Sequence, residues 1–408
     1  MNTPSLKPSQ YTSKKVAIGG IVVLVVVLAL AAVGSRLYIS RQLDARYIKS
    51  PIWLTESPLY AFDAGIGYRY VANARVHLAM FGPNNHFVRS SLVMVNNAGH
   101  LSPDDDSVEK PASEFRIAAL DDSFTACPSS DVSWPTLAEK VLNSDAGLKK
   151  VLGNKTFKFV NFAQDGTGFS QFERNDALEA VRYQPDLVVL NFISDDISRR
   201  FVYRNQVQVR HRESRYYVTV TSSSLPADLT NPACAFARIV AVDPQRLSAA
   251  WDLHDIRSDI SASAVRSVSG FGLYSRLAIQ QVSYKVGLVS KVEFDWDQTN
   301  PRYQTQQAAV QASLAAIRAI ASRHPRFLVL YHPSEKELLA HSTPVITEDL
   351  LGTPGPIKVV RMNEYLPSGS ESQIQSWFNA GDGHPSDLGA QVYAEAVAGR
   401  IREYMLSR

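Results

Sequence analysis

The chain has few cysteines and no strong excess of charge, and both shortages exclude whole classes of protein. Two cysteines among 408 residues cannot build a disulfide-rich scaffold or a zinc site of four cysteines. A net charge of +3 lacks the basic excess that binding to a nucleic-acid backbone requires. The nine histidines show no metal-ligand spacing such as HExxH, and the sequence has no glycine-rich phosphate loop. We therefore expect no metal, no cofactor and no nucleic-acid partner, and the oligomeric state stays open.

One long run of apolar residues, Val16–Val33, breaks an otherwise ordinary composition. A helix over this run would be roughly 27 Å long at 1.5 Å per residue, close to the hydrocarbon thickness of a bilayer. A cleaved signal peptide is the alternative, but its apolar part is usually shorter, about 7 to 15 residues. Basic residues flank the run on both sides, so charge alone does not decide its orientation. The run predicts a transmembrane helix over 16–34 that follows a cytoplasmic tail, 1–15, with the rest of the chain outside the cytoplasm.

The segment after the apolar run divides into a predicted stalk, 35–50, and a β-rich region, 51–112. Two runs in the β-rich region, Tyr68–Phe81 and Ser91–Asn97, have the composition of strands. Turn signals follow them at 82–85 and 98–99. We expect this region to precede the catalytic part of the chain and not to form a catalytic unit of its own.

From residue 113 onward, short apolar runs alternate with helical patterns. The apolar runs lie at 115–120, 157–162, 186–193, 326–331 and 356–362, and the helical patterns lie near 134–142, 170–183, 303–322 and 387–405. Such alternation predicts an α/β domain over 113–408 with a flavodoxin-like, three-layer α/β/α architecture and a five-stranded, mainly parallel sheet. The alternation stops between about 198 and 300, a stretch too long for an ordinary connection, which predicts a folded insertion.

Three residues suited to nucleophilic catalysis lie next to predicted elements of this sheet. Ser123 follows the first strand, and Asp382 and His384 precede the last helix. A serine hydroxyl is a weak nucleophile that needs a base, which His384 can supply if Asp382 orients its imidazole. Taken singly, each residue is more often structural, as we interpret His332 at the end of the fourth strand to be. Because ligands of such sheets bind at the carboxyl ends of the strands, the three residues together favour a hydrolase site.

Four sequence blocks resemble the SGNH (GDSL-type) serine hydrolase family. They are FRIAALDDSFTAC, VNFAQDGTGFSQF, DLVVLNFISDDI and DGHPSDLGAQVYAEAV. A lead-in, VMVNNAGHLSP, resembles that of membrane-anchored bacterial members, and the resemblance covers about 93–405 without the insertion. It implies a single-pass protein of the bacterial inner membrane whose periplasmic domain is a serine esterase or O-acyltransferase. The implied substrate is an acyl ester, typically an acetyl ester, of an envelope or secreted polysaccharide.

The resemblance also implies a role for each matching residue. Ser123 would be the nucleophile, His384 its base, and Asp382 the residue that orients the base. The backbone N–H groups of Ser123 and Gly166 would belong to the oxyanion hole. The third oxyanion donor falls on position 195.

Three positions depart from the family pattern. Asp121 and Ile193 replace glycines, and Asp195 replaces the asparagine that donates to the oxyanion. An ionised carboxylate only accepts hydrogen bonds, and loss of one donor costs roughly 10²–10³ in rate. Asn191 is one candidate substitute donor, and a protonated Asp195 is another solution. The competing hypothesis is a catalytically degenerate protein that binds glycan or assists polysaccharide assembly through the same cleft.

Two further features involve the insertion. Cys127 follows Ser123 by about one helical turn and Cys234 lies in the insertion, so they either form a disulfide outside the cytoplasm or remain two buried thiols. The run 199–217 interleaves six arginines with four aromatic residues. Such a run can bind an anionic glycan or phospholipid headgroups, but we interpret it as a solvated strand face with aromatic packing behind it.

Overall fold

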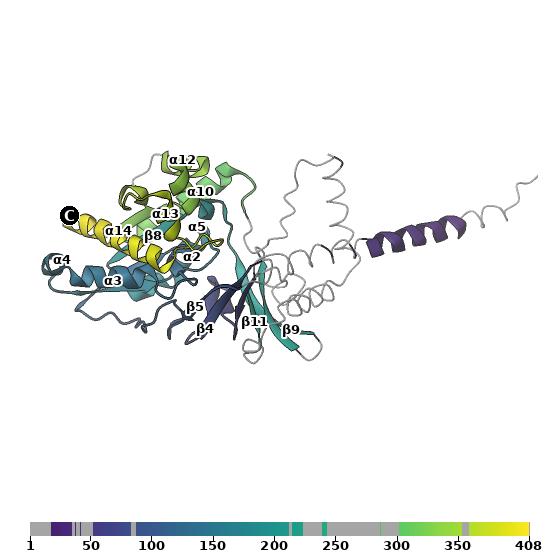
Figure 1. Cartoon of the computed structure of the whole chain (residues 1–408), viewed down its shortest axis with the longest axis horizontal. Coiled ribbons are helices and arrows are strands. Elements are labelled where there is room, and N and C mark those ends of the chain that lie inside the picture. The colour runs from purple at the N-terminus through teal and green to yellow at the C-terminus, as the bar shows by residue number, and fades with distance from the viewer. Residues whose placement is uncertain are drawn as a thin grey trace, which may run out of the picture.

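The computed structural model describes residues 18–34, 37, 41, 52–82, 87–211, 214–222, 239–242, 286, 302–352 and 359–407, and Figure 1 shows the chain as a whole. Residues 18–34 are helical. Among the residues just given, no helix is long and apolar enough to cross a membrane, so the transmembrane helix predicted over 16–34 has no support from the structure. The predicted tail, 1–15, and most of the predicted stalk, 35–50, lie outside the described residues.

A five-stranded sheet forms the centre of the C-terminal part of the chain. Its strands, in spatial order, are β13 (Val359–Arg361), β12 (Phe327–Tyr331), β8 (Leu187–Phe192), β6 (Glu114–Leu120) and β7 (Thr156–Asn161). All neighbouring pairs are parallel, so the α/β fold and the five strands predicted from the apolar runs are confirmed. Because the strands are parallel, the segments that follow them meet at one edge of the sheet.

Helices cover both faces of this sheet (Figure 1). On one face, α3 (Trp134–Ser144) and α14 (Asp387–Leu406) share a core with the strands. On the other face, α5 (Phe169–Leu178) and α10 (Gln306–Arg323) share a second core. Strands covered on both faces read as continuous apolar runs, which is why the sequence LVVLNF of β8 is buried at every position. The three-layer arrangement follows directly from these two cores.

The other α-helices that the structure describes in the C-terminal part of the chain are short. They are α2 (Ser123–Ala126), α4 (Ala146–Val151), α6 (Ser194–Ser198), α11 (Glu335–Ala340), α12 (Val345–Gly352) and α13 (Glu371–Ser376). Three of them, α2, α6 and α11, directly follow β6, β8 and β12. They therefore lie at the carboxyl edge of the sheet, where chemistry is expected.

A second sheet, which we call the accessory sheet, combines strands of the β-rich region with strands of the insertion. Its six strands, in spatial order, are β5 (Phe87–Met94), β4 (Arg75–Phe81), β1 (Ile52–Thr55), β11 (Ile239–Val242), β10 (Ser214–Ser222) and β9 (Tyr203–His211). The parallel pairing of β1 with β11 joins the two regions, and the other pairs are antiparallel. This joining was not predicted, because the two partners lie on either side of half of the α/β domain in the sequence.

A separate two-stranded hairpin, which we call the tyrosine hairpin, consists of β2 (Tyr60–Asp63) and β3 (Gly67–Tyr70). The single strand predicted over Tyr68–Phe81 is therefore wrong. The chain turns after β3 at Asn73, whose φ of 59° lies in the left-handed region that asparagine tolerates, and β4 then begins. The strand predicted over Ser91–Asn97 is present as β5 but begins and ends earlier.

Candidate active site

Ser123 lies where β6 ends and α2 begins, at the carboxyl edge of the five-stranded sheet. Asp122 caps α2, since its Oδ1 accepts a hydrogen bond of 2.8 Å from the backbone N–H of Phe124. Ser123 is 7% exposed and lines a cleft of about 560 Å³. The sequence DDSF thus forms a capped helical turn whose first residue borders the cleft.

His384 and Asp382 reach the same cleft from the loop that precedes α14. Gly381 and Gly383, on either side of Asp382, have φ angles of 74° and 76°, a left-handed conformation that glycine adopts without steric cost. The backbone N–H of Asn379 donates to the carbonyl oxygen of His384 at 2.8 Å and closes the loop. The sequence GDGH therefore folds into a tight turn that carries both side chains to the serine.

The three predicted catalytic side chains form a connected series. Ser123 Oγ and His384 Nε2 are 2.8 Å apart. His384 Nδ1 lies 2.9 Å from Asp382 Oδ1. Burial alone disfavours the imidazolium, but the Asp382 carboxylate outweighs burial and raises the pKa of His384. The series can take the proton of Ser123 and hold it on His384.

Arg89, on strand β5 of the accessory sheet, is a residue of the site that sequence reasoning missed. Its Nη2 donates to Asp382 Oδ2, and its Nη1 donates to the carbonyl oxygen of Ser129. Burial works against an ionised Asp382, but His384 and Arg89 together hold the pKa of this carboxyl below its ordinary value. Arg89 precedes Asp382 by 293 positions, so no local pattern in the sequence connects them.

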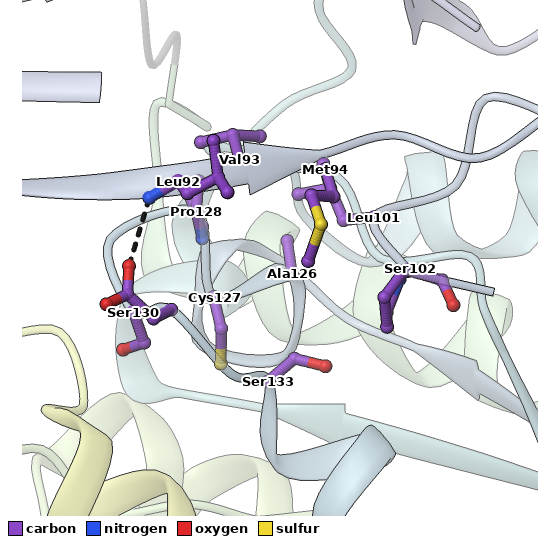
Figure 2. Close-up of a pocket in the computed structure, with 12 residues that line it drawn as sticks. Leu92, Val93, Met94, Leu101, Ser102, Ala126, Cys127, Pro128, Ser130 and Ser133 are labelled. Atoms are coloured by element: carbon purple, nitrogen blue, oxygen red, sulfur yellow. Dashed lines mark hydrogen bonds between the residues drawn. The ribbon is translucent and has the colours of Figure 1, made fainter. Parts of the chain in front are cut away.

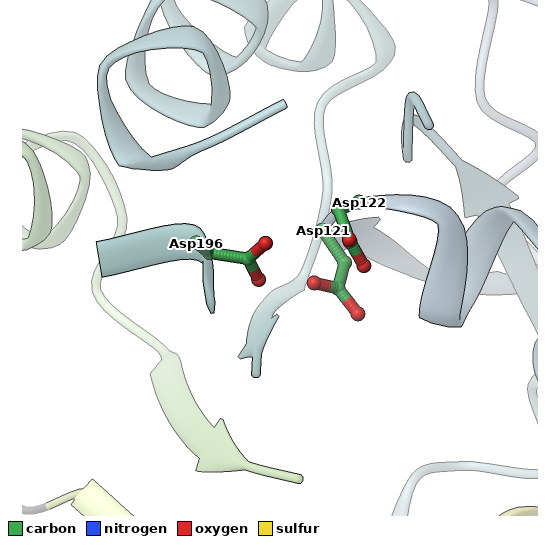
Figure 3. Close-up of side chains that lie close together, drawn as sticks. All are labelled: Asp121, Asp122 and Asp196. Carbon is green, nitrogen blue, oxygen red and sulfur yellow. The ribbon is translucent and has the colours of Figure 1, made fainter. Parts of the chain in front are cut away.

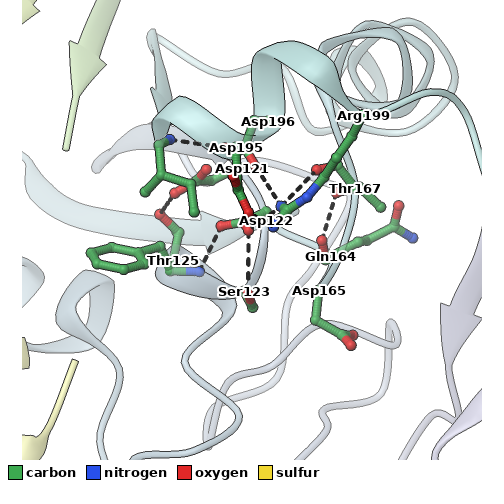
Figure 4. A network of polar contacts seen from close by, with 12 residues as sticks. Asp121, Asp122, Ser123, Thr125, Gln164, Asp165, Thr167, Asp195, Asp196 and Arg199 are labelled. Atoms are coloured by element: carbon green, nitrogen blue, oxygen red, sulfur yellow. Dashed lines mark hydrogen bonds and ion pairs between the residues drawn. The ribbon is translucent and has the colours of Figure 1, made fainter. Parts of the chain in front are cut away.

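Three buried aspartates gather near Ser123 (Figures 3 and 4). Carboxylate oxygens of Asp121, Asp122 and Asp196 lie within 4.8 Å of one another. Arg199 directly follows α6, and its Nη1 donates hydrogen bonds to the carboxylates of Asp122 and Asp196 (Figure 4). The same nitrogen donates to the backbone carbonyl oxygen of Thr167. This guanidinium supplies positive charge to the carboxylates, so the group is an ion-pair network.

Asp121, which stands where the family has glycine, is accommodated as a buried acid. Thr125 Oγ1 donates to Asp121 Oδ2 at 2.5 Å, and within the described part of the chain Asp121 Oδ1 has no hydrogen-bond partner. Burial and, second, the charge of Asp122 raise the pKa of Asp121 well above its ordinary value. The two adjacent carboxyl groups therefore need not both be ionised beside the nucleophile.

The residues expected in the oxyanion hole differ in their access to the cleft. Asp195 and Ile193 line the cleft, and the Asp195 side chain is 58% exposed. Gly166, in the loop after β7, has a φ of 70°, which favours glycine. Asn191 is fully buried in β8 and is not among the described residues that line the cleft. The structure thus brings position 195 to the cleft, whereas neither Gly166 nor Asn191 is among the described residues that line it.

Asn191 instead pairs with His332 at the end of β12. The His332 Nε2 and Asn191 Oδ1 atoms are 3.0 Å apart. Burial lowers the pKa of His332 to about 3, and its ring packs against Trp134 and Tyr393. A neutral, buried imidazole in an aromatic environment fits the structural role that we expected for His332.

The tyrosine hairpin and the accessory sheet also hold the loop that contains Gly166. Asp165, the residue before it, accepts hydrogen bonds from three hydroxyl groups of the tyrosine hairpin, at 3.0, 3.2 and 2.7 Å. Arg204 on β9 donates to the same carboxylate at 2.8 Å. Burial opposes the charge of Asp165, but Arg204 and the tyrosines lower its pKa. The tyrosine hairpin and the insertion therefore meet at Asp165 and fix the backbone next to Gly166.

This network corrects our interpretation of the run 199–217 as a solvated face at two of its arginines, whereas Arg200 is exposed as we expected. Arg199 and Arg204 are 7% and 5% exposed; Arg199 pairs with the buried Asp122 carboxylate and Arg204 with the partly buried Asp165 carboxylate. Arg204 also lies over the rings of Tyr60 and Tyr68, 4.9 and 4.6 Å from the ring centroids. The nearby acidic pair at 195–196 was the local signal that could have identified Arg199, whereas no local signal connects Arg204 with Asp165.

Cys127 is a free, buried thiol. Its Sγ donates to the carbonyl oxygen of Phe124 at 3.0 Å, and burial raises its pKa to about 12. The residue borders a pocket of about 30 Å³ between the end of α2 and strand β5 (Figure 2), which has room for about one water molecule. Cys234 lies outside the described residues, so the predicted disulfide has no support and the alternative of a buried thiol agrees with Cys127.

No family model matches the chain, and no curated protein matches its sequence. A lipase from a goat rumen metagenome resembles it in structure, with 11% identity and a TM-score of 0.34 over 71% of this chain and 98% of the other. A lipase/acylhydrolase from Enterococcus faecalis has 10% identity and a TM-score of 0.34, over 71% and 95% of the two chains. An acetyl xylan esterase from the rumen bacterium Butyrivibrio proteoclasticus has 12% identity and a TM-score of 0.31, over 87% of each chain. At such scores the likeness carries no argument about activity, which has to come from the site itself.

Proposed function

We propose that the chain is an SGNH-type serine hydrolase that cleaves carboxylic esters through an acyl-Ser123 intermediate. The observation that carries the proposal is the 2.8 Å separation of Ser123 Oγ from His384 Nε2 at the edge of a cleft. Asp382 lies behind the imidazole at 2.9 Å. A hydroxyl, an imidazole and a carboxylate at these distances activate the hydroxyl for acyl transfer. The four sequence blocks that resemble the SGNH family support the same reaction.

The reaction proceeds in two half-reactions. Ser123 Oγ bonds to the ester carbonyl carbon, its proton passes to His384 Nε2, and the carbonyl electron pair moves to oxygen. That pair returns as the bond to the alcohol oxygen breaks, and His384 gives the proton to the departing alkoxide. Water then attacks the acyl-serine in the same manner and releases the carboxylic acid and free Ser123. A sugar hydroxyl in place of water would give O-acyl transfer.

The lining of the cleft supports a short acyl group and a polar alcohol. Phe124 and Ile193 are the only large apolar side chains among the described residues that line it, and most of the others are charged or carry hydroxyl groups. A long fatty acyl chain would need an extended apolar surface. Carboxylates, guanidinium groups and hydroxyls suit the hydroxyl groups of a sugar. We therefore infer an acetyl ester of an envelope or secreted polysaccharide as the substrate.

The proposal includes a single-pass anchor in a bacterial inner membrane, with the site in the periplasm. It rests on the apolar run Val16–Val33, in which the described side chains of Ile21 and Leu30 are 62% and 67% exposed. Alkaline extraction of membranes tests the anchor. We expect the full chain to stay in the membrane pellet and a chain that begins at residue 52 to be released. Release of the full chain would contradict the anchor without affecting the esterase proposal.

Turnover of p-nitrophenyl acetate by the purified chain tests the proposed activity. We expect hydrolysis that Ser123→Ala abolishes while the far-UV circular dichroism is unchanged, and a faster reaction with the acetyl than with the octanoyl ester. The departure at Asp195 motivates the competing hypothesis of a degenerate glycan-binding protein. A folded chain that binds acetylated glycan but shows no Ser123-dependent turnover would favour that hypothesis.

A further inference from the structure

Position 195 leaves the proposed esterase one oxyanion donor short, and the neighbourhood of that position suggests what replaces it. Asp195 lines the cleft, but an ionised carboxylate has no proton to donate. Its Oδ2 lies 3.2 Å from Arg302 Nη2 and 3.7 Å from Arg199 Nη2. Asp195 thus faces two guanidinium groups, either of which carries N–H donors of the kind that a developing oxyanion needs.

Of the two arginines, Arg199 is the one built into the site. It lines the cleft together with Ser123 and His384, and it is 7% exposed. Its Nη1 binds the Asp122 carboxylate oxygen that lies 3.2 Å from Ser123 Oγ. A single carboxylate oxygen therefore bridges the guanidinium and the nucleophile, a relation that Figure 4 shows.

The nitrogens of Arg199 are not equally engaged. Nη1 makes three hydrogen bonds, and Nε is buried without a hydrogen-bond partner in the described part of the chain. Among the described residues, the ion-pair partner of Nη2 is Asp195 Oδ2 at 3.7 Å, which exceeds hydrogen-bonding distance. Because Nη1 is committed to the cluster and Nε is covered, Nη2 is the donor that remains for a group entering the cleft.

The backbone positions Arg199 through close packing against the loop after β7. A Cβ atom at Gly168 would lie 2.8 Å from Arg199 Cβ and 2.9 Å from its carbonyl oxygen, a separation that real side chains do not reach. Glycine at 168 therefore allows the loop that carries Gly166 to touch the end of α6. Next to this contact, Arg199 Nη1 donates a hydrogen bond to the carbonyl oxygen of Thr167.

The charges around Arg199 leave it able to act on an anion. Asp195 has its own partner in Arg302. Burial, followed by the charges of neighbouring carboxylates, raises the pKa of both Asp121 and Asp196. Arg199 Nη1 pairs with both Asp122 and Asp196, and because burial disfavours the ionised form of Asp121 and Asp196, the positive charge of Arg199 is not cancelled by four ionised aspartates.

We propose that Arg199, through Nη2, is the third oxyanion donor of this site and replaces the asparagine that the SGNH pattern places at position 195. In this arrangement Asp195 pairs with Arg302 and does not contact the substrate oxygen. The inference rests on the proposed esterase function and adds a catalytic residue to it. During acylation, Nη2–H would donate to the oxygen that receives the carbonyl electron pair, and no further bond is made or broken.

A set of matched variants tests this role by p-nitrophenyl acetate kinetics. Arg199→Lys keeps a positive charge between Asp122 and Asp196 but removes Nη2, so we expect kcat to fall about 10²-fold with little change in KM. Asp195→Asn alone adds an amide donor to a site that already has its third donor, so kcat should change less than about 3-fold. The double variant should recover at least about tenfold over Arg199→Lys, because the new amide replaces the lost donor. Arg200→Lys, at the exposed neighbouring residue, is the control and should match the wild type.

The outcomes separate a catalytic from a structural role. A kcat of Arg199→Lys within about 3-fold of the wild type, or a double variant no better than Arg199→Lys, would overturn the inference. If Arg199→Lys fails to fold, Asp195→Asn decides, because a rise of about 10²-fold would mean that the wild type has no third donor. A wild-type chain without Ser123-dependent turnover would overturn the proposed function together with this inference. Wild-type turnover with an unaffected Arg199→Lys would overturn the inference alone.

Discussion

The five-stranded sheet and the accessory sheet contribute different things to the same site. The five-stranded sheet and its following segments provide the groups that would react, Ser123, His384 and Asp382. The accessory sheet provides groups that hold them, since Arg89 on β5 binds Asp382 and Arg204 on β9 binds Asp165. The tyrosine hairpin completes the second of these contacts.

The difference shows how a site with several buried carboxyl groups keeps its geometry. Asp121 brings a second carboxyl group beside the nucleophile, and buried carboxyl groups are costly unless they are paired or protonated. Arg199 supplies the pairing charge from the beginning of the insertion. Arg89 and Arg204 then hold the loop of Asp382 and the loop of Asp165. If the two sheets differ in this way, substitutions beside the five-stranded sheet should mainly reduce kcat, and substitutions in the accessory sheet should mainly reduce stability or shift the pH dependence.

The largest effect is expected at His384, which belongs to the reacting group. His384→Ala removes the base, so kcat for an acetyl ester should fall about 10⁴–10⁶-fold with little change in the thermal midpoint. His77→Ala, at an exposed histidine paired with Glu56, is the matched control and should leave kcat unchanged. Comparable activity in both variants would place the chemistry elsewhere in the molecule.

Next in size is a loss of stability at the accessory contact with Asp165. Arg204→Met removes the buried cation that pairs with the partly buried Asp165 carboxylate, and breaking such a pair costs up to about 3–5 kcal/mol. Urea denaturation should show this loss, while Arg75→Met, at an exposed position of β4, should change the free energy of unfolding little. Equal stability of the two variants would mean that the accessory sheet does not support the loop of Gly166.

A smaller effect, but one specific to catalysis, is expected at Arg89. His384 must be neutral to accept a proton, and Asp382 raises its pKa, so the wild-type kcat/KM should rise with pH along a limb centred above about 6.5. The charge of Arg89 opposes the imidazolium. Arg89→Met should therefore move this limb to higher pH and lower kcat about tenfold.

Arg89→Lys serves as the conservative control for that shift. It retains a positive charge near Asp382 and should leave the limb close to its wild-type position. A purely structural role of Arg89 would lower activity in both variants without moving the limb. That result would remove Arg89 from the site and leave it as part of the accessory fold.

The smallest effect on kcat is expected at Cys127, which has no role in the proposed reaction. Burial raises the pKa of its thiol to about 12, so the reactive thiolate is scarce at pH 8 and alkylation of the folded chain should be slow. Cys127→Ala should retain kcat within about 2-fold. Mass spectrometry after alkylation, with and without prior reduction, checks this directly. A thiol that becomes reactive in the unfolded chain only after reduction would restore the disulfide alternative.

The two sheets also differ in how far the sequence foretells them. The strands of the central sheet are buried on both faces, so each appears as a continuous apolar run, and Ser123 stands immediately after one of them. His384 and Asp382 share a single glycine-rich turn, which makes them readable as a pair. Each of these features involves residues that are close in the sequence, so it can be recognised without the tertiary structure.

The accessory sheet rests on pairings that local patterns do not contain. β1 pairs with β11 across the first half of the α/β domain, and Arg89 meets Asp382 across 293 positions. The sequence pattern of the insertion predicts solvent-exposed arginines, whereas the tertiary structure buries Arg199 and Arg204. The division of Tyr68–Phe81 into two strands likewise depends on tertiary pairing, since β3 pairs with β2 whereas β4 pairs with β1 and β5.

Identification of the residue modified by a fluorophosphonate probe tests the central claim most directly. The probe reacts only with an activated serine and reports the reacting group without knowledge of the natural ester. We expect tandem mass spectrometry to place the phosphonyl group on Ser123 of the wild type, with the rate of modification rising above about pH 6.5 as His384 loses its proton. Modification should be lost in Ser123→Ala and strongly slowed in His384→Ala. A folded chain that is not modified, or is modified at another serine, would contradict the assignment of this site.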